Sequence, residues 1–171
     1  FAINVGESFE HVVMADEAQH FLLASDAGYG FVTNYESMVS KNKNGKAVVT
    51  LTKGAKLMFP SRVNDVDNDL CLSITNEGRM LVFPISDLPQ LSKGKGNKII
   101  SIPSARAAAR EEIVIILKAI AADMPVTIFA GKRKLTLKPD DLAHYRGERG
   151  RRGSKLPRGL QRVDNIIVGE E

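Results

Sequence analysis

Residues 22–32 read LLASDAGYGFV and residues 71–82 read CLSITNEGRMLV, so that the same pattern recurs with Gly28 and Gly78 fifty residues apart. Each stretch consists of two apolar, β-rich runs around a turn. Glycine adopts the positive φ that tight hairpins require, so both stretches are predicted to be β-hairpins. Residues 126–137, VTIFAGKRKLTL, form a weaker third copy around Gly131. The chain is therefore predicted to contain three hairpin repeats.

A polar, basic, glycine-bearing loop follows each hairpin. The three loops are residues 40–46 (SKNKNGK), 92–98 (SKGKGNK) and 149–155 (RGRRGSK). Further strands are predicted after these loops, over residues 47–51, 99–102 and 160–168. The seven prolines fall near the edges of the apolar runs, where strands are expected to end.

Residues 104–123 depart from this pattern. They begin Ala-rich, with Ser104 as a candidate N-cap, which predicts a short helix over about residues 104–110. The β-branched run over residues 113–116 suits a pleated surface better than a helix, so a strand is predicted to follow, as far as about residue 120.

Length and composition indicate a globular domain, and the hairpin repeats predict that it is all-β. The chain has 171 residues, of which 43% are apolar and 26% charged, enough to bury a sizeable core. The repeats are predicted at approximately residues 10–62, 63–123 and 124–168. A unit of this size must bury its sheet against its neighbours, which favours a propeller-like array of blades. The single cysteine, Cys71, excludes a disulfide within the chain and is expected to be a buried hydrophobic residue.

The net charge of +4 conceals blocks of opposite sign. Residues 1–40 contain six acidic residues and no Lys or Arg, whereas residues 41–62 contain six basic residues and no acid. Residues 132–162 contain eleven basic and three acidic residues. Basic blocks of this kind are typical of surfaces that bind polyanions.

Three stretches closely resemble the C-terminal domain of the bacterial topoisomerase IV A subunit. They are residues 26–31 (DAGYGF), 87–98 (DLPQLSKGKGNK) and 147–153 (GERGRRG), and the resemblance extends over about residues 12–168. It implies a β-pinwheel, a propeller-like ring of four-stranded blades that exchange strands between neighbours. The family ring has about five or six blades, so we expect residues 1–171 to be three repeats of one larger domain. The start at Phe1 also leads us to expect a fragment.

The related C-terminal domain of the gyrase A subunit wraps DNA and carries a box reading Gln-Arg-Arg-Gly-Gly-Lys-Gly. No intact copy of the box occurs here, although the three basic loops resemble degenerate versions of it. This departure favours the topoisomerase IV family, and a gyrase-like wrapping domain stays the alternative.

The resemblance implies that duplex DNA binds along the outer rim of the ring, where the basic loops are expected. Lys and Arg neutralise phosphates and release counterions, while glycine allows backbone N–H groups to approach a phosphate closely. The absence of Trp and of a recognition helix disfavours base-specific readout. The predicted DNA-binding residues are Lys41, Lys43, Lys46, Lys93, Lys95, Lys98, Arg149, Arg151 and Arg152.

No catalytic, cofactor-binding or metal-binding residue is expected in this chain. The tyrosines of the chain are Tyr29, Tyr35 and Tyr145, of which Tyr29 and Tyr35 are predicted to be packing residues. Residues 65–69 are predicted to be an exposed acidic turn, since they lack the Gly and Glu of a calcium loop. By the resemblance, the parent protein is an ATP-dependent type IIA topoisomerase that uses ATP and Mg in other domains. Its A subunit dimerises and pairs with an ATPase B subunit in a heterotetramer. The resemblance also implies a cytoplasmic, nucleoid-associated location, with peripheral association at the inner membrane in the family.

A function of another class is a protein-binding scaffold, because propeller-like rings often present their rims to partners. The acidic stretch over residues 1–40, which would repel DNA, supports this alternative.

Overall fold

A computed structural model describes residues 19–34, 36, 51, 54–58, 60–91 and 94–169. The strands within them are β1 (His20–Ala24), β2 (Tyr29–Asn34), β3 (Ser61–Val63), β4 (Leu70–Thr75), β5 (Arg79–Pro84), β6 (Asn97–Lys98), β7 (Val114–Ile120), β8 (Val126–Ala130), β9 (Arg133–Leu137), β10 (Ser154–Lys155) and β11 (Asn165–Val168). The short helices are η1 (Ile85–Asp87), α3 (Ser104–Ala108), α4 (Pro139–Leu142) and η2 (Ala143–Tyr145).

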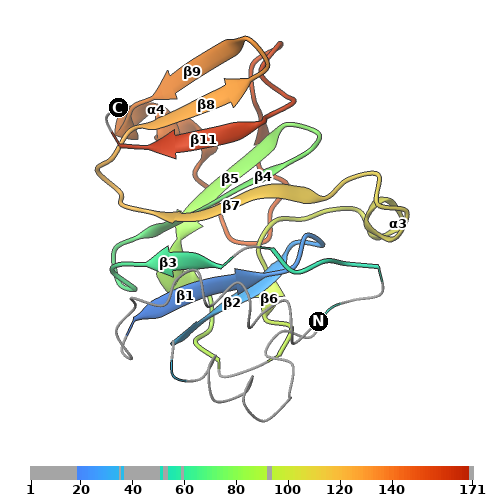
Figure 1. Ribbon diagram of the computed structural model, residues 1–171, viewed down its shortest axis with the longest axis vertical. Helices are drawn as coiled ribbons and strands as arrows, with labels where there is room; N and C mark the ends of the chain where they lie inside the picture. Colours follow the sequence, from blue (N-terminus) through green and yellow to red (C-terminus); the bar gives the residue numbers. More distant parts are fainter. Residues whose placement is uncertain are drawn as a thin grey trace.

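The strands form three antiparallel sheets that follow one another along the long axis of the molecule (Figure 1). The first sheet has the order β3-β1-β2-β6, the second β7-β4-β5-β10, and the described strands of the third β11-β8-β9. The predicted hairpins β1–β2 and β4–β5 form the central strands of the first two sheets, and the third sheet contains the predicted hairpin β8–β9. Gly28, Gly78 and Gly131 have φ of 92°, 79° and 61°, as the hairpin prediction requires.

Neighbouring sheets exchange strands. Strand β6 follows the hairpin of the second sheet along the chain, yet it pairs with β2 of the first sheet. Strand β10 follows the hairpin of the third sheet and pairs in the same way with β5 of the second. This exchange confirms the predicted all-β pinwheel architecture. Each exchanged strand lies at one edge of its sheet, and β3, β7 and β11 lie at the opposite edges. There β7 contacts both β3 and β11.

Two hydrophobic cores fill the spaces between the sheets. Cys71, Leu81 and Phe83 of the second sheet face the core shared with the first sheet. The alternate residues Leu72 and Val82 face the core shared with the third. Because side chains alternate along a strand, a sheet that is covered on both faces needs apolar residues at nearly every position. Strand β4, all six of whose residues are buried, accordingly has apolar side chains at four positions and the small hydroxyl residues Ser73 and Thr75 at the other two.

The region after the second basic loop corrects one prediction. The predicted strand over residues 99–102 is wrong in position, since the paired residues are Asn97 and Lys98 of β6. Ile99 and Ile100 are buried in the first core, and the chain bends there after the amide of Ile99 donates to the Gly28 carbonyl at 2.6 Å. These side chains are apolar because they fill the core rather than because they extend a ladder.

The helix and strand predicted after residue 104 are confirmed by α3 and β7. Ser104 is not the N-cap, because Pro103 occupies that position and no side chain caps the helix. A strand is predicted within residues 160–168, and in the structure only Asn165–Val168 form one, β11. The strand predicted over residues 47–51 lies, apart from residue 51, outside the described residues, and the three repeat boundaries stay a prediction.

Candidate nucleic-acid interface

The second and third basic loops, about fifty residues apart in sequence, meet at the edge that carries the exchanged strands. The Gly150 amide donates to the Ile99 carbonyl at 2.9 Å, and the Ser101 amide donates to the Arg151 carbonyl at 2.9 Å. The Arg149 guanidinium also donates to the Lys98 carbonyl at 2.8 Å. These bonds hold the segments of Lys98, Arg149 and Arg151 together, and Lys95 lines the same cavity as Lys98. We call Lys95, Lys98, Arg149 and Arg151 the basic ridge.

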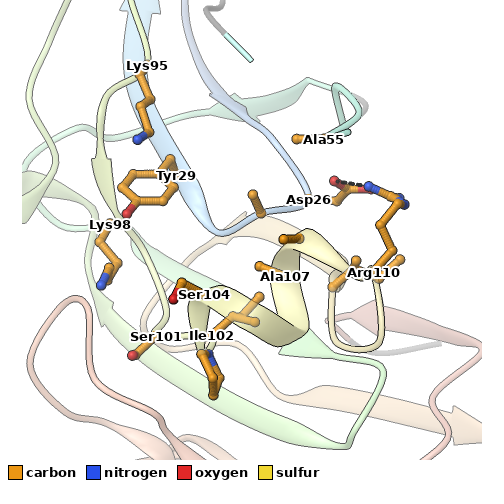
Figure 2. A pocket seen from close by; sticks show the side chains of 14 residues that line it. Asp26, Tyr29, Ala55, Lys95, Lys98, Ser101, Ile102, Ser104, Ala107 and Arg110 are labelled. Carbon is orange, nitrogen blue, oxygen red and sulfur yellow. Dashed lines mark hydrogen bonds and ion pairs between the residues drawn. The ribbon is translucent and has the colours of Figure 1, made fainter. Parts of the chain in front are cut away.

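Lys95 and Lys98 lie on either side of an aromatic ring. The ammonium of Lys95 is 4.0 Å from the centroid of the Tyr29 ring, a cation–π distance. Tyr29 also pairs with Lys98 across β2 and β6. Both lysines are exposed and, with Tyr29, line a cavity of about 530 Å³ (Figure 2). The ring therefore orients one ammonium group and leaves both accessible to an anion.

The other end of this cavity is neutralised by an ion pair. Arg110 contacts the Asp26 carboxylate at 2.5 Å and donates to the carbonyl of Gly54 at 2.5 Å. Asp26 raises the pKa of the Arg110 guanidinium, chiefly through the hydrogen bond and also through its charge. The cationic character of the cavity thus lies at its Lys95 and Lys98 end.

The positive charge of Arg151 is only weakly neutralised within the protein. Its guanidinium is 3.0 Å from the Glu148 carboxylate, and the two side chains are 71% and 79% exposed. Exposed pairs of this kind contribute little, about 0 to 1 kcal/mol, so a phosphate can replace Glu148 at small cost.

Arg152 points inward instead. Its Nη1 donates to the Ser101 carbonyl at 2.6 Å and lies 3.1 Å from Glu112, whose side chain is completely buried. Arg106 lies 3.9 Å from the same carboxylate and also pairs with Glu77. Of the three predicted arginines, Arg152 is thus the one that the structure uses to compensate a buried charge.

Replacing Arg152 by Ala is expected to lower the free energy of unfolding by about 3 kcal/mol, because removing one partner leaves Glu112 buried with only a distant cation. Urea unfolding measures this change. Arg151→Ala is the matched control, since its pair with Glu148 is exposed and its loss should cost less than about 1 kcal/mol. Equal unfolding free energies for the two variants would contradict this role of Arg152.

Two loop glycines allow the exchanged strands to pair closely with their neighbours. A Cβ on Gly96 would lie 2.0 Å from the Gly30 carbonyl oxygen, and a Cβ on Gly153 would lie 2.5 Å from the Met80 carbonyl oxygen. Residues 30 and 80 are equivalent in the repeat. The sequence suggests close approach to a phosphate as the reason for glycine in these loops. At Gly96 and Gly153, however, the close neighbour is the backbone of the strand that pairs with β6 or β10 in the same sheet.

This equivalence also points to a residue that the sequence prediction did not name. Residues 96–99 read GNKI and residues 153–156 read GSKL, so Lys155 occupies the place of Lys98, and Arg152 that of Lys95. The spacing Gly-x-Lys-aliphatic was the available signal. Lys155 is exposed. Four other predicted DNA-binding residues, Lys41, Lys43, Lys46 and Lys93, lie outside the described residues, as does Tyr35.

The surroundings of Cys71, Tyr145 and Asp65 fit a structural role for each of them. Cys71 is buried, which raises the pKa of its thiol, and burial likewise raises the pKa of Tyr145. Asp65 accepts hydrogen bonds from the backbone and side chain of Asn68 and from the Asp67 amide, and these bonds lower its pKa, the Asn68 side chain most. Its oxygens are thus used within the turn. The described residues contain no group of His, Cys, Asp and Glu that could hold a metal ion.

No helix in the described ranges has the length and apolar character needed to cross a membrane.

Comparison with a protein-family model matches residues 19–64 and 69–118 to the DNA gyrase C-terminal domain, β-propeller. Over 163 residues the chain is 54% identical to the A subunit of DNA topoisomerase 4 from Pseudomonas aeruginosa and 50% identical to that from Escherichia coli. Both alignments cover 95% of this chain but only 22% and 21% of the relatives, so the chain spans about a fifth of their length.

Solved structures agree with this comparison. The E. coli ParC C-terminal domain superposes with a TM-score of 0.83 at 49% identity, over 92% of this chain and 63% of that one. The DNA gyrase A C-terminal domain superposes with a TM-score of 0.67 over 91% of this chain and 50% of that one. Because the sequence identity is only 12%, this second similarity shows a shared fold alone.

Proposed function

The chain belongs to the family of C-terminal domains of the topoisomerase IV and gyrase A subunits, and from this premise we propose that it binds duplex DNA along the basic ridge. The observation that carries the proposal is the convergence of two basic loops from different repeats at one edge of the pinwheel. Bonds from Arg149 and Gly150 to the segment that contains Lys98 hold this convergence together.

Electrostatics supports a polyanionic ligand. Lys95, Lys98 and Arg149 form no ion pair with a described residue, and Glu148 binds Arg151 only in an exposed pair. Cations that gather without compensating acids repel one another, and a polyanion relieves that repulsion. Duplex DNA presents regularly spaced phosphates and gains affinity from the counterions that it releases.

The proposed contact is with the DNA backbone rather than with base edges. Helices α3 and α4 have five and four residues, too short to serve as recognition helices among the described elements. Tyr29, the aromatic residue of the site, has Lys95 over its ring. Binding is therefore expected to follow the shape and bending of the duplex more than its sequence.

For the whole protein, we propose the function that its relatives' name indicates. The domain would capture and orient a duplex for ATP-dependent strand passage by a type IIA topoisomerase, and so support decatenation and supercoil relaxation during chromosome segregation. ATP, Mg and the partner ATPase subunit would act in other domains, in a cytoplasmic, nucleoid-associated enzyme.

A salt series tests the proposed binding. If the intact chain makes about six phosphate contacts, the slope of log K against log salt should be roughly −5 for a mixed-sequence duplex, as measured by fluorescence anisotropy. A slope near zero would contradict DNA binding. A protein partner that co-purifies after nuclease and high-salt treatment, together with that flat slope, would favour the scaffold function.

A further inference from the structure

The exchanged strands place two lysines at equivalent positions of neighbouring sheets. In the first sheet Lys98 pairs with Tyr29, and in the second Lys155 pairs with Arg79. The residues that follow also correspond, because the Ile99 amide donates to the Gly28 carbonyl and the Leu156 amide donates to the Gly78 carbonyl at 2.8 Å. The strand pairing and the backbone hydrogen bond found at Lys98 thus recur at Lys155.

The second of these positions holds two cations side by side. Residues directly paired across antiparallel strands share a face, so the side chains of Lys155 and Arg79 project to the same side of the second sheet. Arg79 is half-buried, and its Nη1 donates to the Gly153 carbonyl at 3.4 Å, which keeps the guanidinium beside β10. Lys155 is exposed.

No described acid neutralises this pair. Neither Lys155 nor Arg79 is among the residues that form ion pairs within the described ranges. Like charges directly opposite each other on neighbouring strands are destabilising. Such a pair is therefore a place where a bound anion lowers the energy of the folded protein.

We propose that Lys155, supported by Arg79, is a second phosphate contact, equivalent on the second sheet to Lys98 on the first. One duplex would then cross both exchanged strands and meet one such contact on each sheet. This inference rests on the proposed DNA binding and adds to it the path of the duplex, from the basic ridge along β10.

Lys155→Gln tests the inference in the full chain, with Lys118→Gln as a matched control. Lys118 is an exposed lysine on β7, at the opposite edge of the same sheet, so both variants remove one exposed charge. The probe is a duplex of mixed sequence, about 30 base pairs long, in a salt series. Lys155→Gln should reduce the magnitude of the log–log slope by about 0.9 and weaken binding about eightfold at 0.1 M salt. Lys118→Gln should leave both values unchanged.

Lys98→Gln distinguishes failure of this inference from failure of the proposed function. If Lys98→Gln weakens binding while Lys155→Gln behaves like Lys118→Gln, the duplex does not cross β10 and the inference is wrong. Equal weakening by Lys155→Gln and Lys118→Gln also overturns it, since the effect would then follow net charge alone. If none of the three variants changes binding, the duplex does not bind along the basic ridge, and the proposed function fails together with this inference. The double variant Lys98→Gln/Lys155→Gln should reduce the slope by about 1.8.

Discussion

Gly96→Ala is expected to lower the free energy of unfolding by about 3 to 5 kcal/mol, at least as much as the loss of Arg152. The new Cβ would lie 2.0 Å from the carbonyl oxygen of Gly30 and 2.3 Å from its carbonyl carbon. Both atoms belong to the backbone of β2, which cannot move without breaking its pairing with β1. Urea unfolding followed by circular dichroism measures the loss.

Gly131→Ala separates this clash from the cost of an unusual backbone conformation. Gly96 and Gly131 both have positive φ, 81° and 61°, but a Cβ on Gly131 meets nothing within 4 Å. Gly131→Ala should therefore cost only about 1 to 2 kcal/mol, from the left-handed conformation alone. A similar cost for both variants would show that the exchanged strand β6 does not pack against β2 as described.

Removing the four charges of the basic ridge is expected to have the largest effect on DNA binding. The variant replaces Lys95, Lys98, Arg149 and Arg151 by Gln and keeps Arg152, because that residue compensates the buried Glu112. Each lost phosphate contact removes about 0.9 log units of affinity at 0.1 M salt relative to 1 M, so the loss of four contacts corresponds to a weakening of roughly four-thousandfold. Equilibrium binding to a duplex at 0.1 M salt measures this change.

Arg62→Gln/Lys118→Gln provides the control for charge removal elsewhere. Both residues are exposed, on β3 and β7, at the sheet edges opposite the exchanged strands. Their replacement should change affinity by less than about twofold, because no phosphate contact is removed. If this control lost as much affinity per charge as the ridge variant, binding would depend on net charge and not on the ridge.

The hairpins were predictable because their signal is local. Gly28 and Gly78 stand at turns between apolar runs, and a tight hairpin needs positive φ at just such positions. The bend at Ile99 and Ile100 was not predictable in this way. A short apolar run has the same appearance whether it lies in a strand or fills a core from a bend, and only the packing of neighbouring sheets distinguishes the two.

The candidate site was predictable in part. Basic residues close to glycine located the two loops that meet, but the pattern did not separate Lys95 from Arg152, which occupy equivalent places in the repeat. Lys95 lies over Tyr29, whereas Arg152 turns toward Glu112, and the burial of Glu112 is created by the tertiary fold. The charge pattern alone did not single out Lys155. The recurring Gly-x-Lys-aliphatic spacing was the available signal, but only the strand register shows that Lys155 and Lys98 hold equivalent positions.

The central claim is that one duplex is held by cations that two repeats bring together at the ridge. The most direct test measures the slope of log K against log salt for the unaltered chain and for the four-residue ridge variant, side by side on the same duplex. We predict that the magnitude of the slope falls by roughly 3.6 in the variant, about 0.9 for each of the four cations. Equal slopes for the two proteins would contradict the claim.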